Sequence, residues 1–143
     1  MVELSDDSIQ AWNTFVMNSE HSACEVGSER RAAAIANHFM ALANNGGLNA
    51  FLTYSYDLAA REVVASLDLI GASLAADELR LVLDNLGVEL EVQTQNKRWD
   101  LLELHWHDAL DDHDVLSDMA DQGLMSALQK HVCENRSFYV ALT

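Results

Sequence analysis

The stretch DLAAREVVASLDLIGASLAADELRLVLDNL, residues 57–86, decides the fold class of this chain. Apolar residues recur in it every three or four positions, which is the spacing of one face of an α-helix. The first set is Ala60, Val63, Val64, Leu67 and Ile70, and the second is Ala75, Leu79, Val82, Leu83 and Leu86. Gly71 and Gly87 follow the two sets, and glycine commonly ends helices. The stretch therefore predicts two amphipathic helices, over about 57–70 and 74–86.

Two serines are placed to cap the starts of predicted helices. Ser73 is a favourable N-cap for the helix at 74–86, and Ser5 is a favourable N-cap near the start of the chain. The helix that Ser5 begins should run to about Asn18. Its apolar positions are Ile9, Trp12 and Val16.

A further helix is predicted from about Glu29. Its apolar positions are Ala32, Ile35, Phe39 and Leu42. The sequence Asn44-Asn45-Gly46-Gly47 should end it, because Asn and Gly tolerate the left-handed conformation found at helix ends. A short apolar element is then expected at 48–54.

The chain after Gly87 is expected to be an extended connector followed by more helices. Apolar and polar residues alternate over 88–93, which is a strand pattern but a short and isolated one. A helix should begin near Arg98, with Trp99, Leu102, Trp106, Ala109 and Leu110 as its apolar stripe. Beyond Leu110 the apolar stripe shifts by about a quarter turn around the helix axis, counting 100° per residue. This shift predicts a break at 112–114, with an aspartate capping the next helix. Gly123 should interrupt that helix, and a last one should span 124–134.

Proline is absent from the 143 residues, although average usage would give about seven. Helix interiors tolerate proline worst, so its absence suits a chain that is nearly all helix. A chain of this length usually forms one domain. The sequence therefore predicts an all-α fold, a single compact multi-helix domain over 1–143 with one short extended connector.

The chain is strongly acidic, with 23 Asp and Glu against 8 Lys and Arg, a formal net charge of −15. Nucleic acids and anionic membranes bind basic surfaces, so direct binding to either is not expected. Partners should be basic. A general solubility role for the charge is the alternative.

The two cysteines, Cys24 and Cys133, lie far apart and form no metal-binding or disulfide pattern. Free thiols in a reducing compartment are the simple interpretation, with Cys133 partly buried on the last helix. The acidic N-terminus lacks the features of a signal peptide, and no run approaches the roughly 18 apolar residues of a membrane span. A cytoplasmic location is expected.

The segment HFMALANNGGLNAFL, residues 38–52, with Leu69-Ile70-Gly71-Ala72 after it, resembles the signature of a bacterial family of DNA-mimic proteins. That family was long catalogued as a domain of unknown function. Leu48 stands where the family usually has Phe, and Tyr54 replaces the Asn before Ser55. The resemblance implies an all-α fold and a homodimer whose carboxylates imitate DNA phosphates for a DNA-binding protein.

The acidic residues concentrate in the segment 100–121, which contains no Lys or Arg. Residues three or four apart on a helix lie about 5–6 Å apart at Cβ, so such carboxylates would form a sparser version of the phosphate row of DNA. Like charges at this spacing destabilise a helix, which favours a partner-binding face over a merely solvated one. The predicted partner-binding residues are Asp100, Glu103, Asp108, Asp111, Asp112, Asp114, Asp118 and Asp121.

The same segment offers histidines beside aspartates, from His105 to His113, which are ligand types suited to zinc. No known spacing signature accompanies them, and His105 and His107 would point to different faces of a helix. We therefore predict no metal site and no cofactor. Sequence motifs of nucleophilic, phosphate-binding and zinc-dependent enzymes are also missing.

These observations favour a non-enzymatic protein that occupies the basic surface of a DNA-binding protein, such as a transcriptional regulator. An immunity-type inhibitor of a basic toxin is the alternative, and a metal-dependent enzyme using His105–His113 is the less favoured one. Trp12, Trp99 and Trp106 fall on apolar stripes and are expected in the core. His38 is expected to be a structural histidine.

Overall fold

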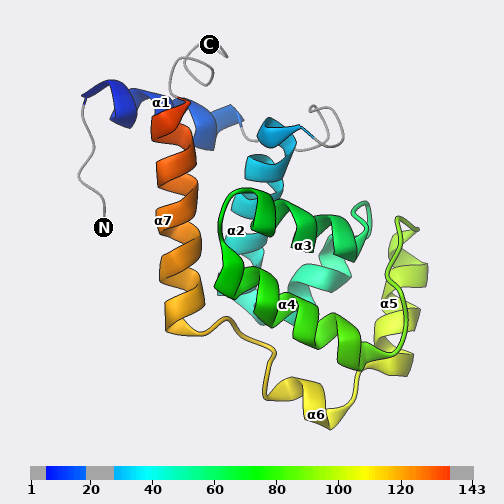
Figure 1. Cartoon of the computed structure of the whole chain (residues 1–143). Helices are drawn as coiled ribbons and strands as arrows, with labels where there is room; N and C mark the ends of the chain where they lie inside the picture. The colour runs from blue at the N-terminus through cyan, green and yellow to red at the C-terminus, as the bar shows by residue number, and fades with distance from the viewer. Residues whose placement is uncertain (1–5, 19–27, 136–143) are drawn as a thin grey trace.

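The structure, a computed structural model, describes residues 6–18 and 28–135, and these residues form seven helices and no strand (Figure 1). The helices are α1 (Asp6–Asn18), α2 (Glu29–Tyr54), α3 (Ala60–Leu69), α4 (Ser73–Leu86), α5 (Gln95–His105), α6 (Asp108–Asp111) and α7 (Asp118–Glu134). The all-α prediction is confirmed. None of the described helices is both long and apolar enough to cross a lipid bilayer. Ser5 and Cys24 lie outside the described residues.

Helix α2 is the centre of the packing. It contacts α3, α5 and α7, while α4 packs across α3 and α7, and α1 crosses one end of α7 (Figure 1). Buried apolar side chains from all seven helices form one cluster. At its middle, the rings of Phe39 and Phe51 meet edge to face with centroids 4.8 Å apart. Burial of apolar side chains is the main favourable term in folding, so this cluster fixes how the helices are arranged.

Helix α2 does not end at Asn44-Asn45-Gly46-Gly47, so that prediction is wrong. It kinks at Gly47, whose φ of 85° and ψ of −179° are not helical, and continues to Tyr54. The main-chain N–H groups that the kink exposes find acceptors on Asp114. Leu48 donates to the Asp114 carbonyl, and Asn49 donates to its carboxylate at 2.7 Å. A residue 65 positions away therefore caps the second half of α2.

The helices α3 and α4 follow the predicted stripes, but their starts differ. Helix α3 begins at Ala60 because Ser55 to Leu58 form a turn, in which the Leu58 N–H bonds the Ser55 carbonyl at 3.1 Å. Ser73 does not cap α4, since the N-cap is Ala72 and it makes no side-chain bond. The predicted extended connector is present. It is tied to the start of α3, where the Ala60 N–H donates to the Leu90 carbonyl at 2.9 Å, and to the α2–α3 turn, where the Gln93 N–H donates to the Tyr56 carbonyl at 3.0 Å.

The predicted break at 112–114 is confirmed, because it lies in the loop 112–117, but the structure adds a second break at 106–107. Helix α5 ends at His105, α6 is a single turn, and residues 112–117 form a loop. Ser117, not an aspartate, caps α7 by accepting the Ala120 N–H at 3.2 Å. Helix α7 also runs through Gly123, because the buried stripe of Ala120, Leu124, Leu128 and Val132 is continuous. That burial outweighs the cost of one helical glycine, about 1 kcal/mol.

Arg98 is buried beneath α5 with no exposed surface, which the sequence did not predict. Its guanidinium donates five hydrogen bonds, to the Gln93 side chain and to main-chain carbonyls of α2, the following turn and the connector. The carbonyls belong to Leu52, Ser55, Leu58 and Glu91. Burial lowers the pKa of Arg98 to about 10, against the opposing attraction of Asp57. The side chain therefore remains charged near pH 7, and it provides donors for buried carbonyls at and just beyond the end of α2.

Two smaller predictions are confirmed. His38 is structural, because its Nε2 lies 3.1 Å from the Ser55 hydroxyl and its ring meets Phe51 edge-on. Cys133 is a partly buried free thiol on α7.

Candidate partner-binding face

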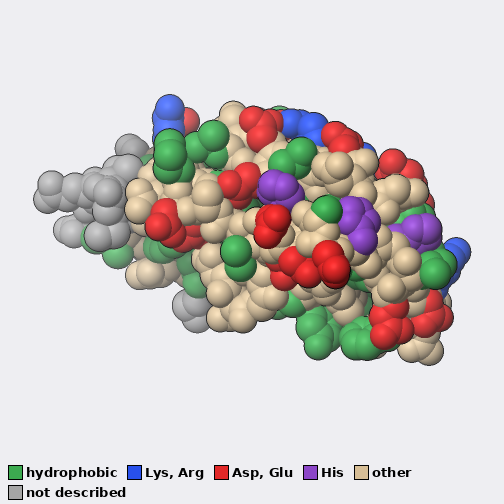
Figure 2. Space-filling view, turned by 90° about the horizontal axis from the view of Figure 1, so that it is seen from below, with side chains coloured by type: hydrophobic (Ala, Val, Ile, Leu, Met, Phe, Trp, Pro, Cys, Tyr) green, Lys and Arg blue, Asp and Glu red, His purple; other side chains and the backbone are tan. Residues whose placement is uncertain are grey.

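The acidic segment follows one border of the molecule, which we call the lower edge. It consists of α5, α6, the loop 112–117 and the first turn of α7. Figure 1 shows α6 and the loop beneath α4, and the view from below in Figure 2 shows carboxylates and histidines gathered on that face. The eight predicted residues all lie on these elements, but the row bends twice, at 106–107 and at 112–117.

Three of the eight carboxylates have structural partners. Asp111 accepts the indole N–H of Trp106 at 2.8 Å, and Asp121 accepts the side-chain amide of Asn44 at 3.0 Å. Asp114 caps α2 as described above. The other five residues, Asp100, Glu103, Asp108, Asp112 and Asp118, are exposed, and Asp111 is exposed as well.

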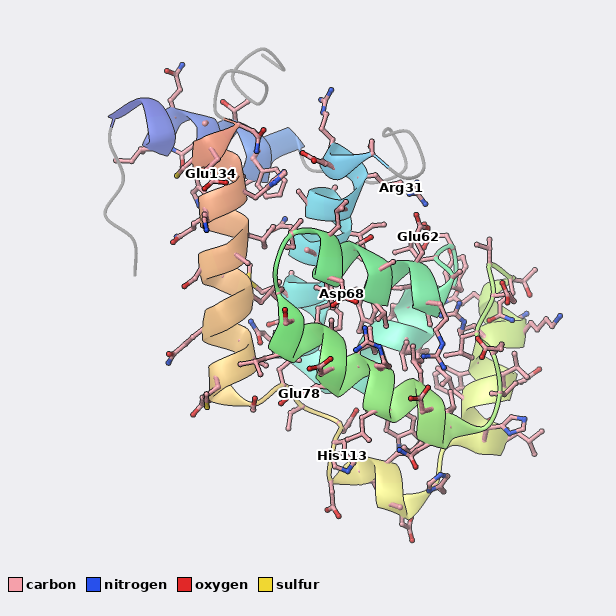
Figure 3. The ribbon with its side chains drawn as sticks, viewed as in Figure 1. Arg31, Glu62, Asp68, Glu78, His113 and Glu134 are labelled. Carbon is pink, nitrogen blue, oxygen red and sulfur yellow. The ribbon has the colours of Figure 1, made fainter. Side chains whose placement is uncertain are left out.

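Basic side chains neutralise carboxylates elsewhere in the molecule. Arg31 binds Glu62 at 2.7 Å near the start of α2 (Figure 3), and Arg80 binds Asp68 and Asp77, each at 2.6 Å. Arg61 binds Asp84 at 2.8 Å. Within residues 6–18 and 28–135, no ion pair involves a carboxylate of the 100–121 segment. The lower edge therefore keeps its negative charge.

The lower edge is anchored to the middle and to the last turn of α4. The Glu78 carboxylate accepts the Ser117 N–H at 3.0 Å, and His107 Nε2 lies 3.0 Å from the Asn85 carbonyl. Figure 3 shows Glu78 on α4 above the loop that contains His113. These bonds position the loop and α6 before any partner arrives, which reduces the ordering cost of binding.

The histidines of the segment do not converge. His105 lies in the last turn of α5, His107 is the residue before α6, and His113 is in the loop. Across the described part of the chain, no group of three or more His, Cys, Asp or Glu side chains is placed to hold a metal ion.

The prediction that all three tryptophans lie in the core is wrong for Trp99, which is 51% exposed. The reason is the rotation of α5. Arg98 and Leu102, four residues apart, form its buried face, and this places Trp99 at the margin of the helix. Trp99 and the half-buried Trp106 instead line a cleft of about 270 Å³ between α5 and α2. Sequence reasoning missed this because it drew the buried face as an apolar stripe through Trp99 and did not include Arg98 in that face.

Comparison with known proteins identifies the family of this chain. Neither the curated proteins nor the solved structures include a significant match to this chain. The family model described as DMP19-like protein matches residues 25–133, which is more than half of the chain and covers α2 to α7 almost completely. The chain therefore belongs to the DMP19-like protein family, a family of DNA-mimic proteins.

Proposed function

We propose that this protein is a non-enzymatic DNA mimic, and that its lower edge binds the basic surface of a DNA-binding protein such as a transcriptional regulator. The observation that carries the proposal is the set of exposed carboxylates at Asp100, Glu103, Asp108, Asp112 and Asp118, with no ion pair among the described residues to neutralise them. Membership of a DNA-mimic family supports the same class of function.

The spacing of the carboxylates suits a surface that reads phosphates. Asp100 and Glu103 are neighbours on one helix, as Asp108 and Asp112 are around α6, and such neighbours lie about 5–6 Å apart at Cβ. DNA carries one phosphate per about 3.4 Å of each strand, so the protein row is sparser than the phosphate row but has the same sign. Lysines and arginines that contact phosphates would meet acceptors of similar charge and hydrogen-bonding capacity.

The first experiment isolates a basic partner from cell extract at low salt and measures its binding by fluorescence anisotropy. The test variant combines Asp100→Asn, Asp108→Asn, Asp112→Asn and Asp118→Asn. We expect it to bind at least about tenfold more weakly, because several charge-assisted contacts are lost together. A DNA duplex should compete with the parent protein for the same partner.

The matched control removes four exposed carboxylates elsewhere: Asp57→Asn, Asp77→Asn, Glu91→Gln and Glu134→Gln. Its net charge equals that of the test variant, and it should bind nearly as well as the parent. If the two variants weakened partner binding equally, the lower edge would contribute to binding only through the overall charge of the protein. A ternary complex of partner, DNA and this protein would exclude mimicry and favour an inhibitor of another basic surface.

A further inference from the structure

The cleft between α5 and α2 has walls of an unusual composition. Its lining residues are Trp99, Leu102, Glu103 and Trp106 from α5 and the residue after it, and Asn49 and Thr53 from α2. Residues three, four and seven positions apart share one side of a helix, so the α5 residues form a single wall. The two tryptophans are two turns apart, or about 10 Å along the helix axis. Glu103, which supplies a carboxylate, lies between the two tryptophans in the sequence.

Hydrogen bonds to α6 and to the loop 112–117, and one within α2, hold this cleft in shape. The Trp106 indole donates to Asp111 on α6 at 2.8 Å. The main-chain N–H of Asn49 donates to Asp114 in the loop at 2.7 Å, and the Thr53 hydroxyl donates to the Asn49 carbonyl at 2.9 Å. Leu102 is buried beneath the opening. The cleft is therefore built by the fold, and the exposed Trp99 and Glu103 make its wall accessible to a partner.

This combination of groups suits a cation. The face of an indole ring carries negative electrostatic potential, and tryptophan is the aromatic residue that attracts cations most strongly. An adjacent carboxylate adds a charge-assisted hydrogen bond. The lining contains no Lys or Arg that would repel a cation.

Arginine suits the cleft better than lysine. Its guanidinium is planar, stacks on aromatic rings, is weakly hydrated and can bind a carboxylate through two parallel hydrogen bonds. Its alkyl stem can lie along the apolar parts of the wall. A lysine ammonium would keep more of its water and present only a point charge.

We propose that the cleft is an arginine-binding site, in which Glu103 binds the guanidinium and Trp99 and Trp106 contact its faces. That the arginine belongs to the protein's partner rests on the proposed function. An arginine in a nucleic-acid-binding protein meets phosphates and base rings together, and this cleft offers it a carboxylate and indole rings together. The mimicry would then include the aromatic surface of DNA as well as its charge.

The test titrates the full-length protein with N-acetyl-arginine amide while the three tryptophan indole N–H signals are followed by ¹H–¹⁵N NMR. We expect saturable shifts at Trp99 and Trp106, with Trp12 on α1 unaffected as an internal reference. Glu103→Gln should weaken binding about fivefold, and Glu91→Gln, the matched exposed control, should leave it unchanged. Trp99→Ala should abolish saturation, and its unchanged far-ultraviolet circular dichroism would show that the fold is kept.

The neutral analogue N-acetyl-citrulline amide has nearly the shape of arginine without its charge, so it should bind at least about fivefold more weakly. Equal binding of citrulline, or no saturable shift at Trp99, would overturn the proposal. Tighter binding of N-acetyl-lysine amide would overturn it in favour of an ammonium site. The titration needs no partner protein, and the four-Asp variant above keeps Glu103, so this proposal and the proposed function can fail separately.

Discussion

Gly47 allows α2 to turn at its kink while Asp114 approaches it closely. A β-carbon at this position would lie 2.8 Å from the Asp114 carbonyl oxygen, and the φ of 85° with ψ near 180° is a conformation that essentially only glycine adopts. We expect Gly47→Ala to lower the free energy of unfolding by about 2–3 kcal/mol, as measured by urea denaturation.

Gly123 provides the matched control for that prediction. It lies inside α7 at ordinary helical φ, and a β-carbon there would meet no atom within 4 Å. Gly123→Ala should raise the free energy of unfolding by about 0.5–1 kcal/mol, because alanine loses less entropy in a helix. If Gly47→Ala were as stable as the parent, the close approach of Asp114 would not constrain the chain.

Arg98 has the largest structural role of any single polar residue described. Arg98→Met keeps much of its length but removes the donor to four main-chain carbonyls, of which the Ser55 carbonyl keeps its bond from the Leu58 N–H. Each unsatisfied buried group costs about 1–3 kcal/mol, partly offset by removal of the buried charge, so we expect a net loss of about 3–5 kcal/mol. Lys97→Met, at the exposed neighbouring position, should change stability by less than about 0.5 kcal/mol. Urea denaturation of both variants measures the difference, and similar stabilities would contradict the role of Arg98.

At the scale of elements, helix α7 contains a half-buried titrating group. Burial lowers the pKa of His131 below its ordinary 6.5, although Glu29 and Glu134 act in the opposite direction. Between the folded and unfolded pKa values the unfolded chain binds more protons, so stability rises with pH there. The contribution of neutral His131 is complete above about pH 6.5 and declines as the pH falls below it.

His131→Gln should therefore reduce the loss of stability between about pH 7.5 and pH 5.5. Comparing urea denaturation of parent and variant at each pH isolates this residue, because the carboxylates are common to both. His113→Gln, on the exposed loop, is the matched histidine-to-glutamine control. An identical pH dependence for parent and His131→Gln would show that His131 protonation is not coupled to folding.

Elements whose buried face is apolar could be predicted from sequence, and the others could not. The buried face of α4 is apolar throughout and that of α3 is apolar except for Ser66, and both helices lie close to their predicted ranges. Helix α5 buries Arg98 beside Leu102. The apolar stripe predicted through Trp99 therefore gave the wrong rotation of α5 about its own axis. The continuation of α2 past Gly47 depends on Asp114, whose position relative to α2 no local pattern contains.

The candidate site was likewise predictable only in part. The sequence located the acidic segment because charge is visible without a fold. It could not show that Asp111, Asp114 and Asp121 bind other groups of the protein, because those contacts depend on tertiary structure. The cleft at Trp99 depends on the rotation of α5 and was missed for the same reason.

For the whole molecule, the net charge of −15 and its uneven neutralisation determine how a partner would be bound. Exposed charges are screened over about 8–10 Å at physiological ionic strength, so the complex should weaken steeply as salt rises. The four-Asp variant should show a shallower slope of log Kd against log salt, because fewer ion contacts form. The four-residue control should keep the parent's slope. The measurement is the same anisotropy titration at several salt concentrations, and equal slopes for all three proteins would place the ion contacts outside the lower edge.

The burial of Arg98 also has a consequence for local unfolding. Helix α5 has only Arg98 and Leu102 buried, and a peripheral helix with so few buried residues usually opens on its own at low cost. Here, opening α5 would withdraw the guanidinium from the end of α2, the turn and the connector at the same time. The opening of α5 is therefore coupled to the loss of structure at the centre of the molecule. Its amide protons should exchange with solvent almost as slowly as those of α2.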